Sequence, residues 1–320
     1  MVGWLDRLQQ RHRVVGFVVA VIYKYVDDQG SYLAALITYY AFVSLFPLLL
    51  LLTTALGVVL VGHPDLQRQV LQSALSQFPV IGDQLTQPHQ LSGGTAGVLV
   101  GIAGAIYGGM GVGQAVQNAM DSVWAVPRNI RPDPLRSRLK SLLLMLVLGG
   151  AALGATVLSL ITRAADDFGF LSTAVAILAT IAINAAICLV AFRLTTARRL
   201  TYGQLFPGAL AAALAWQLLQ WFGAGYIGHI VKTASTTNSV FALVLGALAF
   251  LYLISTSLVL SAEINVVRVK GLYPRALLTP FTDNVELTPA DRKTYSGRAK
   301  AERAKGFQQV DVSFDQPDSA

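Results

Sequence analysis

The sequence predicts an all-α, polytopic membrane protein: a bundle of six transmembrane helices, with amphipathic helices at the N-terminus and in the first external loop. Of the 320 residues, 54% are hydrophobic and only 13% are charged, whereas an ordinary soluble domain has about 25% charged residues. Six apolar runs are long enough to cross a bilayer as helices, which takes about 20 residues. Basic residues also alternate between many and few in successive loops. These three observations define the class.

The pattern of basic and apolar residues in 1–30 predicts a cytoplasmic amphipathic segment. Basic residues up to Arg13 precede a short apolar run, but Lys24 and Asp27 follow it where a signal peptide would have a small-residue cleavage site. Apolar side chains between 14 and 26 recur at helical spacing. We expect a helix lying in the membrane interface. A simple helical lead-in to the first span is the alternative.

Residues 31–270 predict the transmembrane domain. Barrel strands need only about 10 residues, so the length of the apolar runs favours helices. Pro47 lies inside the first run, where it removes a backbone donor and predicts a kink or break near residues 44–46. Pro207 lies at the start of the fifth run, where proline is tolerated. The expected spans are approximately 33–61, 94–119, 139–161, 171–192, 205–227 and 239–270.

The orientation follows from the loops. The numbers of Lys and Arg before, between and after the apolar spans are 4, 1, 5, 1, 3, 1 and 9, when basic residues at the span ends (Lys140, Arg268 and Lys270) are counted with the adjoining loop or tail. Cytoplasmic loops hold the excess of basic residues, so both termini are expected in the cytoplasm. The same rule explains the net charge of +7, and no nucleic-acid partner is expected. The single cysteine, Cys188, lies in an apolar run and excludes an internal disulfide.

Two segments outside the spans, 64–90 and 271–320, differ from the spans in composition. Residues 64–90 place apolar residues at helical spacing with glutamines opposite, which predicts an external amphipathic helix on the bilayer or over the bundle. Residues 271–320 are polar and charged, which predicts a disordered cytoplasmic tail. Its basic part, 292–305, either touches anionic lipid or only solubilises the chain.

Small residues recur at every fourth position of the second span and include Gly97, Gly101, Gly109 and Gly113. Such a stripe lets two membrane helices approach closely, so we expect helix packing here. The glycine-rich stretch lacks the spacing and the lysine of a phosphate-binding loop.

Polar residues within or at the ends of the spans are the candidate functional residues. Two interpretations remain open: a polar cavity that accepts a cargo, or interhelical hydrogen bonds of about 0.6 kcal/mol each that only hold helices together. The candidates are Glu263, Asn265, Asp121, Asn118, Gln114, Arg193, Asn184, Tyr39, Tyr40 and Ser44.

The chain has no pattern typical of a soluble active site. Its four histidines fall in different segments without a second ligand three or four residues away, and no zinc-protease or nucleophile-elbow motif is present. We therefore expect neither an enzyme nor a metal or other cofactor.

Four motifs resemble the YihY/BrkB family of bacterial inner-membrane proteins over about residues 10–280. They are ALITYYAFVSLFPLLLLLTTALG (35–57), NAMDSVWAVPR (118–128), PGA (207–209) and SAEINVVR (261–268). Two positions depart from the family pattern: Ser261 replaces a frequent glycine, and Asp121 a common asparagine. That second departure puts a neutral role at position 121 in doubt.

The resemblance implies a six-helix inner-membrane protein linked to serum resistance and to export of envelope lipids. A ribonuclease label once used for the family is regarded as mistaken. Three hypotheses follow: a transporter or flippase acting on a lipid or amphiphile through a polar cavity open toward the cytoplasm, a structural protein of the envelope, and, as a weak third, an RNA-processing enzyme. Membrane lipids are the expected partners. The sequence leaves oligomeric state, cargo, direction and energy source open.

Glu263 is the most informative single residue. With both termini inside, the sixth span exhausts the hydrocarbon near residues 259–261, because about 20 helical residues cross it. Glu263 then lies at the cytoplasmic boundary, near the ends of the spans that hold Asp121 and Arg193. We expect a charged layer in which Glu263 pairs with Arg193 or another basic neighbour.

Overall fold

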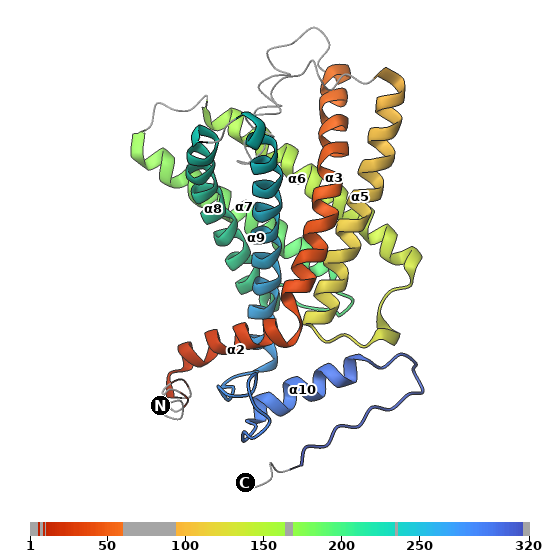
Figure 1. Cartoon of the computed structure of the whole chain (residues 1–320), viewed down its shortest axis with the longest axis vertical. Helices are drawn as coiled ribbons and strands as arrows, with labels where there is room; N and C mark the ends of the chain where they lie inside the picture. The colour runs from red at the N-terminus through yellow and green to blue at the C-terminus, as the bar shows by residue number, and fades with distance from the viewer. Residues whose placement is uncertain are drawn as a thin grey trace.

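The computed structural model describes residues 6, 9, 11–59, 94–163, 169–233 and 236–315. Within these ranges every regular element is a helix, so the protein is all-α (Figure 1). The elements are α2 (Arg13–Asp27), α3 (Gly30–Val59), α5 (Gly94–Val123), the short 3₁₀ helix η2 (Arg128–Ile130), α6 (Pro134–Arg163), α7 (Gly169–Thr195), α8 (Tyr202–Thr233), α9 (Thr236–Lys270) and α10 (Pro289–Ala301). The helix expected at 64–90 lies outside the described residues.

Each of the six expected spans corresponds to one long helix, α3 or one of α5 to α9. By length and composition, three described segments can cross a membrane: Ile177–Thr195 in α7, Tyr202–Gly223 in α8 and Val244–Lys270 in α9. The described apolar part of α3, Gly30–Leu45, is shorter. For α3, α5 and α6 the span assignment therefore stays a prediction.

Helix α9 is central to the bundle. It packs against α3 and α5 on one side and against α8 on the other, while α7 and α6 complete the ring. Helix α2 lies across one end of these helices, and α10 lies beyond it (Figure 1). The main core gathers at that end around Met120, Trp124, Phe192, Val259 and Val266. The tightest packing in the described residues is thus where the charged candidates were expected.

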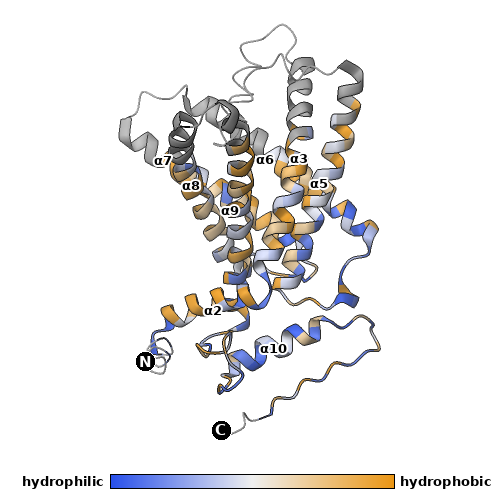
Figure 2. Ribbon diagram, in the orientation of Figure 1, coloured by the Kyte–Doolittle hydropathy of each residue, from blue (hydrophilic) through white to orange (hydrophobic). Residues whose placement is uncertain are grey.

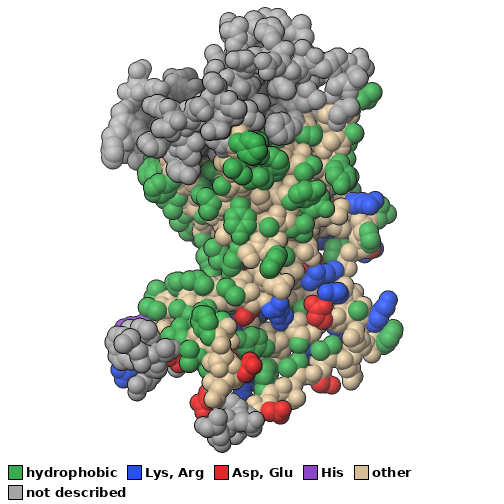
Figure 3. Space-filling model, viewed as in Figure 1, with side chains coloured by type: hydrophobic (Ala, Val, Ile, Leu, Met, Phe, Trp, Pro, Cys, Tyr) green, Lys and Arg blue, Asp and Glu red, His purple; other side chains and the backbone are tan. Residues whose placement is uncertain are grey.

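Hydropathy separates the two parts of the molecule. Orange, hydrophobic colour dominates the described parts of α3, α5, α7, α8 and α9, whereas α10 and the chain around it are largely blue (Figure 2). On the visible face, hydrophobic side chains cover the bundle, and Lys, Arg, Asp and Glu gather towards the α2 end (Figure 3). The exposed apolar surface belongs to helices whose composition suits a bilayer.

Glycines of α5 bring two helices close. A methyl group at Gly104 would come within 2.7 Å of Pro47 on α3, and one at Gly108 would overlap Ser44. The predicted stripe faces α6 instead, because a methyl group at Gly109 would overlap Met145. One at Gly113 would lie 2.6 Å from Ser141. Gly101 is buried, and Gly97 lies in the first turn of α5.

Two expectations need correction. Helix α3 runs unbroken through Pro47, so the chain does not break at residues 44–46. The tail is not disordered throughout, because α10 forms within it. The start of α10 has a capping box, in which the side chains of Thr288 and Asp291 each accept from the other's backbone N–H. The buried Arg275 side chain, fully shielded from solvent, attaches this segment to α2. A buried ion pair supplies order that composition alone does not reveal.

Candidate functional site

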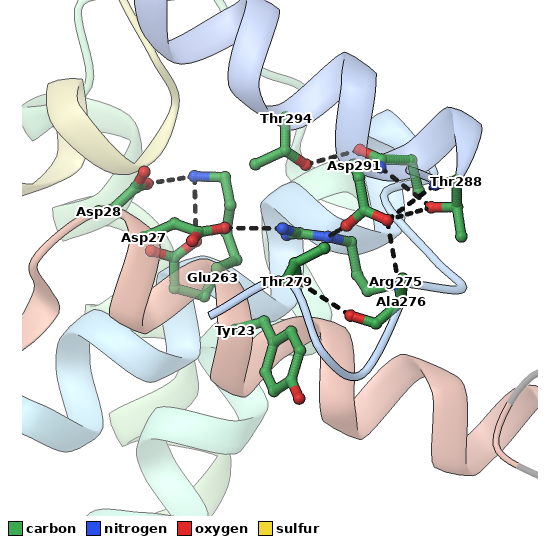
Figure 4. Close-up of polar contacts among 12 residues, drawn as sticks. Tyr23, Asp27, Asp28, Glu263, Arg275, Ala276, Thr279, Thr288, Asp291 and Thr294 are labelled. Atoms are coloured by element: carbon green, nitrogen blue, oxygen red, sulfur yellow. Dashed lines mark hydrogen bonds and ion pairs between the residues drawn. The ribbon is translucent and has the colours of Figure 1, made fainter. Parts of the chain in front are cut away.

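Glu263 lies at the α2 end of α9, and its side chain is 0% exposed. Its Oε2 atom is 3.7 Å from Nζ of Lys24, which is itself 3% exposed. Lys24 also forms an ion pair with Asp28 and donates to the Val123 carbonyl at 3.2 Å. Asp28 and Glu263 thus converge on one ammonium group (Figure 4). We call Lys24, Asp28 and Glu263 the ionic latch.

Local sequence explains how α2 supplies two of the three groups. Lys24 and Asp28 are four residues apart, so they share one helical face. Helix α2 ends there, and Gln29 adopts a positive φ of 56° that turns the chain into α3. The face that carries Lys24 also contains Gly16, Ala20 and Val21, all buried. Helix α2 therefore packs against α9 with small side chains and with one long cation.

The electrostatics of the latch keep Lys24 charged. Burial works to lower the pKa of Lys24, but the carboxylates of Glu263 and Asp28 outweigh it and raise the pKa above its ordinary value. Within the described residues, neither oxygen of Glu263 has a hydrogen-bond partner, so the long contact with Lys24 is its main polar neighbour. Removing either Lys24 or Glu263 would therefore leave the other as a buried charge without its partner.

A second buried cluster ties the tail to α2. Nη2 of Arg275 lies 2.9 Å from Asp27, and the same guanidinium pairs with Asp291 at the start of α10 (Figure 4). The two carboxylates raise the pKa of Arg275 further although burial opposes them. Burial raises the pKa of Asp27, and Arg275 counteracts part of that rise. We call Asp27, Arg275 and Asp291 the tail clamp.

The PGA motif (207–209) of α8 and the SAEINVVR motif (261–268) of α9 are far apart in the sequence but contact each other. Pro207 has no N–H, so the Gly203 carbonyl lacks its helical donor, and Nη1 of Arg268 donates to that carbonyl at 3.1 Å. The next amide, Gly208 N–H, donates to Oδ1 of Asn265 at 2.7 Å. A methyl group at Gly208 would overlap Ser261 and Asn265. Arg268 thus replaces the donor that Pro207 removes, and Asn265 accepts from the amide next to the proline.

The other charged candidates lie elsewhere. Asp121 is buried and accepts from the Ala197 amide at 2.7 Å, so it holds the turn between α7 and α8. Arg193 is exposed, and its guanidinium lies 4.2 Å from the centre of the Tyr202 ring. Glu263 was expected to pair with Arg193 or another basic neighbour, and the structure gives the second alternative, because Lys24 is that neighbour.

The uncharged candidates are dispersed as well. Asn118 is exposed and accepts from Arg131 at 3.2 Å, Gln114 is exposed and Asn184 is half-buried. Tyr39 is 60% exposed, whereas Tyr40 packs on Gly111. Ser44 donates to the Ala41 carbonyl at 2.9 Å. Glu263, Asn265 and Asp121 are buried. The candidate residues as a set therefore do not line one cavity open toward the cytoplasm in this conformation.

Sequence reasoning missed Lys24, Asp28, Arg275 and Asp291 as site residues. The four-residue spacing of Lys24 and Asp28 on an expected helix was a readable signal for the first pair. Nothing local indicates Arg275, because its partners come from α2 and α10. Among the described residues, no group of three or more His, Cys, Asp or Glu side chains is placed to hold a metal ion.

Long apolar helices closed at one end by buried ion pairs define a class: helical integral membrane proteins with a charged layer at a bundle end. The family model of the virulence factor BrkB matches residues 21–277, which include the latch and Arg275. The chain belongs to the BrkB family. It is also 28% identical over 123 residues to the inner membrane protein YhjD of Escherichia coli (strain K12), a stretch that covers 36% of each chain. No solved structure matches.

Proposed function

We propose that this BrkB-family protein is a six-span inner-membrane protein, with both termini in the cytoplasm, that moves a lipid or amphiphilic envelope component across the bilayer. Helices α3 and α5 to α9 are the spans. The protein performs no catalytic chemistry of its own. The latch is the closed cytoplasmic end of a pathway between helices, and separation of Lys24 from Glu263 opens it.

The observation that carries this proposal is the complete burial of Glu263 beside a cation from another helix. Apolar residues of similar volume hold helices together as well as or better than a buried ion pair does. Ionisable residues kept within membrane helices mark transport pathways more often than packing contacts. In Figure 1, α3 and α5 diverge from α7, α8 and α9 away from the α2 end.

Helix α2 supports the orientation. It exposes Val14, Val15, Val18, Ile22 and Val26 within one arc of about a third of its circumference, opposite the buried Lys24. An exposed apolar face on a helix that crosses the end of the bundle suits the membrane interface. We propose that this face rests in the cytoplasmic leaflet.

The second candidate function is a structural role in the envelope. The bonds of Asn265 to Gly208 and of Asp121 to Ala197 favour it, because both satisfy backbone groups and neither requires a cargo.

Complementation of a deletion strain tests the proposal. Full-length protein should restore envelope resistance to bile salts, whereas Glu263→Gln at equal membrane abundance should not. Gln114→Ala, which alters an exposed candidate on α5, is the matched control. Full restoration by Glu263→Gln would remove the latch from any transport role and favour the structural candidate.

A further inference from the structure

Two arginines converge on the first turn of α8 from different helices. Arg193, in the last turn of α7, stacks on the ring of Tyr202, and Arg268, in the last turn of α9, donates to the carbonyl of Gly203. Both arginines are exposed. Neither forms an ion pair with any described carboxylate. Most of the donors of the two guanidinium groups therefore remain available to an anion.

The turn between these arginines is open. A methyl group added at Gly203 would meet no atom within 4 Å. Tyr202 is 54% exposed and Phe206 is 53% exposed, so aromatic surface lies directly beside the two cations. Tyrosine is enriched at the membrane–water boundary, where its polar end meets the headgroups.

An apolar ridge starts at this turn and follows α8 as far as Phe222. It has a large apolar residue at every fourth position, and all of them are exposed except Leu210, which is half-buried. The ridge consists of Tyr202, Phe206, Leu210, Leu214, Leu218 and Phe222. Residues four apart form a continuous ridge on a helix surface, long enough to lie beside an acyl chain.

We propose that Arg193 and Arg268 bind the phosphate headgroup of an anionic phospholipid of the cytoplasmic leaflet, with its acyl chains along the α8 ridge. Guanidinium groups bind phosphate through paired charge-assisted hydrogen bonds. The chemistry favours a lipid over a free phosphate, because the apolar ridge begins where the cations end. The inference rests on the proposed function only in placing this end of the bundle at the cytoplasmic face.

Native mass spectrometry of the purified full-length protein tests this site. The protein receives equal amounts of phosphatidylglycerol and phosphatidylcholine with identical chains. Wild type should retain phosphatidylglycerol preferentially. Arg193→Gln with Arg268→Gln should weaken that retention about tenfold, the loss expected when charge-assisted hydrogen bonds are removed. Arg193→Gln alone leaves the contact of Arg268 with Gly203 intact, and should give a smaller loss in a protein that folds normally.

The matched control removes two other exposed arginines, by Arg136→Gln with Arg138→Gln at the start of α6. This variant should retain phosphatidylglycerol as wild type does. The proposal is overturned by equal retention of the two lipids, by an equal loss in the control, or by displacement of the lipid with glycerol phosphate, which has no acyl chains. Binding is measured without transport, so this result and the outcome for the proposed function are independent.

Discussion

Glu263 and Asn265 are two residues apart on α9 and both are fully buried, yet their surroundings differ. Asn265 completes the backbone of α8 through a short, well-directed hydrogen bond. Glu263 contacts Lys24 at 3.7 Å, lies near the Asp28 carboxylate, and has no hydrogen bond within the described chain. At the residue scale, Asn265 has a structural role, whereas the role of Glu263 depends on α2 staying in place.

Substituting Asn265 by Leu should destabilise the protein by about 1–3 kcal/mol, because the Gly208 amide then lacks a buried acceptor. Unfolding in detergent, followed by circular dichroism, measures this change. Gln114→Leu, at an exposed position, should change little. Equal stability of Asn265→Leu and wild type would mean that α8 does not need this bond.

The raised pKa of Lys24 predicts how pH acts on the docking of α2. A lysine whose folded-state pKa lies above its ordinary 10.5 contributes stability that is fully present below that value. The contribution is lost as pH rises through the folded-state pKa. The charged groups facing it are Glu263, Asp28 and Asp27.

We therefore expect the difference in unfolding temperature between wild type and Lys24→Met to vary little between about pH 7 and pH 10 and to shrink above about pH 10.5. Lys24→Met should lower the temperature at neutral pH and remove the additional alkaline decrease. An alkaline decrease of the same size in Lys24→Met would assign it to other groups.

The sequence predicted that Glu263 has a basic neighbour, and Lys24 is within 3.7 Å of it; its place at the membrane boundary stays a prediction from helix length and charge alternation. The sequence did not identify that neighbour. Lys24 reaches Glu263 only because α2 crosses α9, and the crossing is set by the turn at Gln29 and by small residues such as Ala20. Contacts of this kind depend on tertiary geometry that spacing alone does not encode.

At the scale of secondary-structure elements, α8 and α9 are joined by side chains of one helix that bind backbone groups of the other. Helix α8 contains Pro207 beyond its first turn, and Arg268 of α9 donates to the Gly203 carbonyl that the proline leaves without its helical donor. Asn265 of α9 accepts from the neighbouring Gly208 amide. The PGA and SAEINVVR motifs are thus two halves of one contact. The glycine stripe of α5 was predictable as a packing feature, but the second row, Gly104 and Gly108, that faces α3 was not.

Substituting Gly208 by Ala should separate α8 from α9, because the added methyl group overlaps Ser261 and Asn265. Overpacking of this kind costs about 1–3 kcal/mol. Thermal unfolding compares it with Gly149→Ala, where the methyl group meets nothing within 4 Å and stability should not fall. Equal behaviour of the two variants would contradict the close contact.

Substituting Arg275 by Gln should release α10 from α2. Asp27 and Asp291 would be left buried without their cation, a loss of about 3–5 kcal/mol for the clamp. Limited trypsin digestion should then cut after Arg292 and Lys293 faster than in wild type. Arg298→Gln, on the exposed side of α10, serves as the control, and unchanged cleavage of Arg275→Gln would show that other contacts hold the tail.

At the scale of the whole molecule, composition and run length were sufficient to predict an all-helical membrane protein. The order in the tail could not be predicted, because it depends on Arg275 reaching two carboxylates from distant segments. We propose that the latch closes the cytoplasmic end of a bundle that moves lipid.

Lipid movement in reconstituted vesicles tests this claim most directly. Vesicles that contain nitrobenzoxadiazole-labelled phospholipid and the full-length protein are exposed to dithionite, which quenches only the outer leaflet. Wild type should expose inner-leaflet lipid faster than protein-free vesicles. Glu263→Gln weakens the pair that holds the pathway closed, so it should speed this exposure about tenfold, equivalent to a barrier lower by about 1.4 kcal/mol. Gln114→Ala should match wild type. A wild-type rate equal to that of protein-free vesicles, or an unchanged rate in Glu263→Gln, would contradict the account.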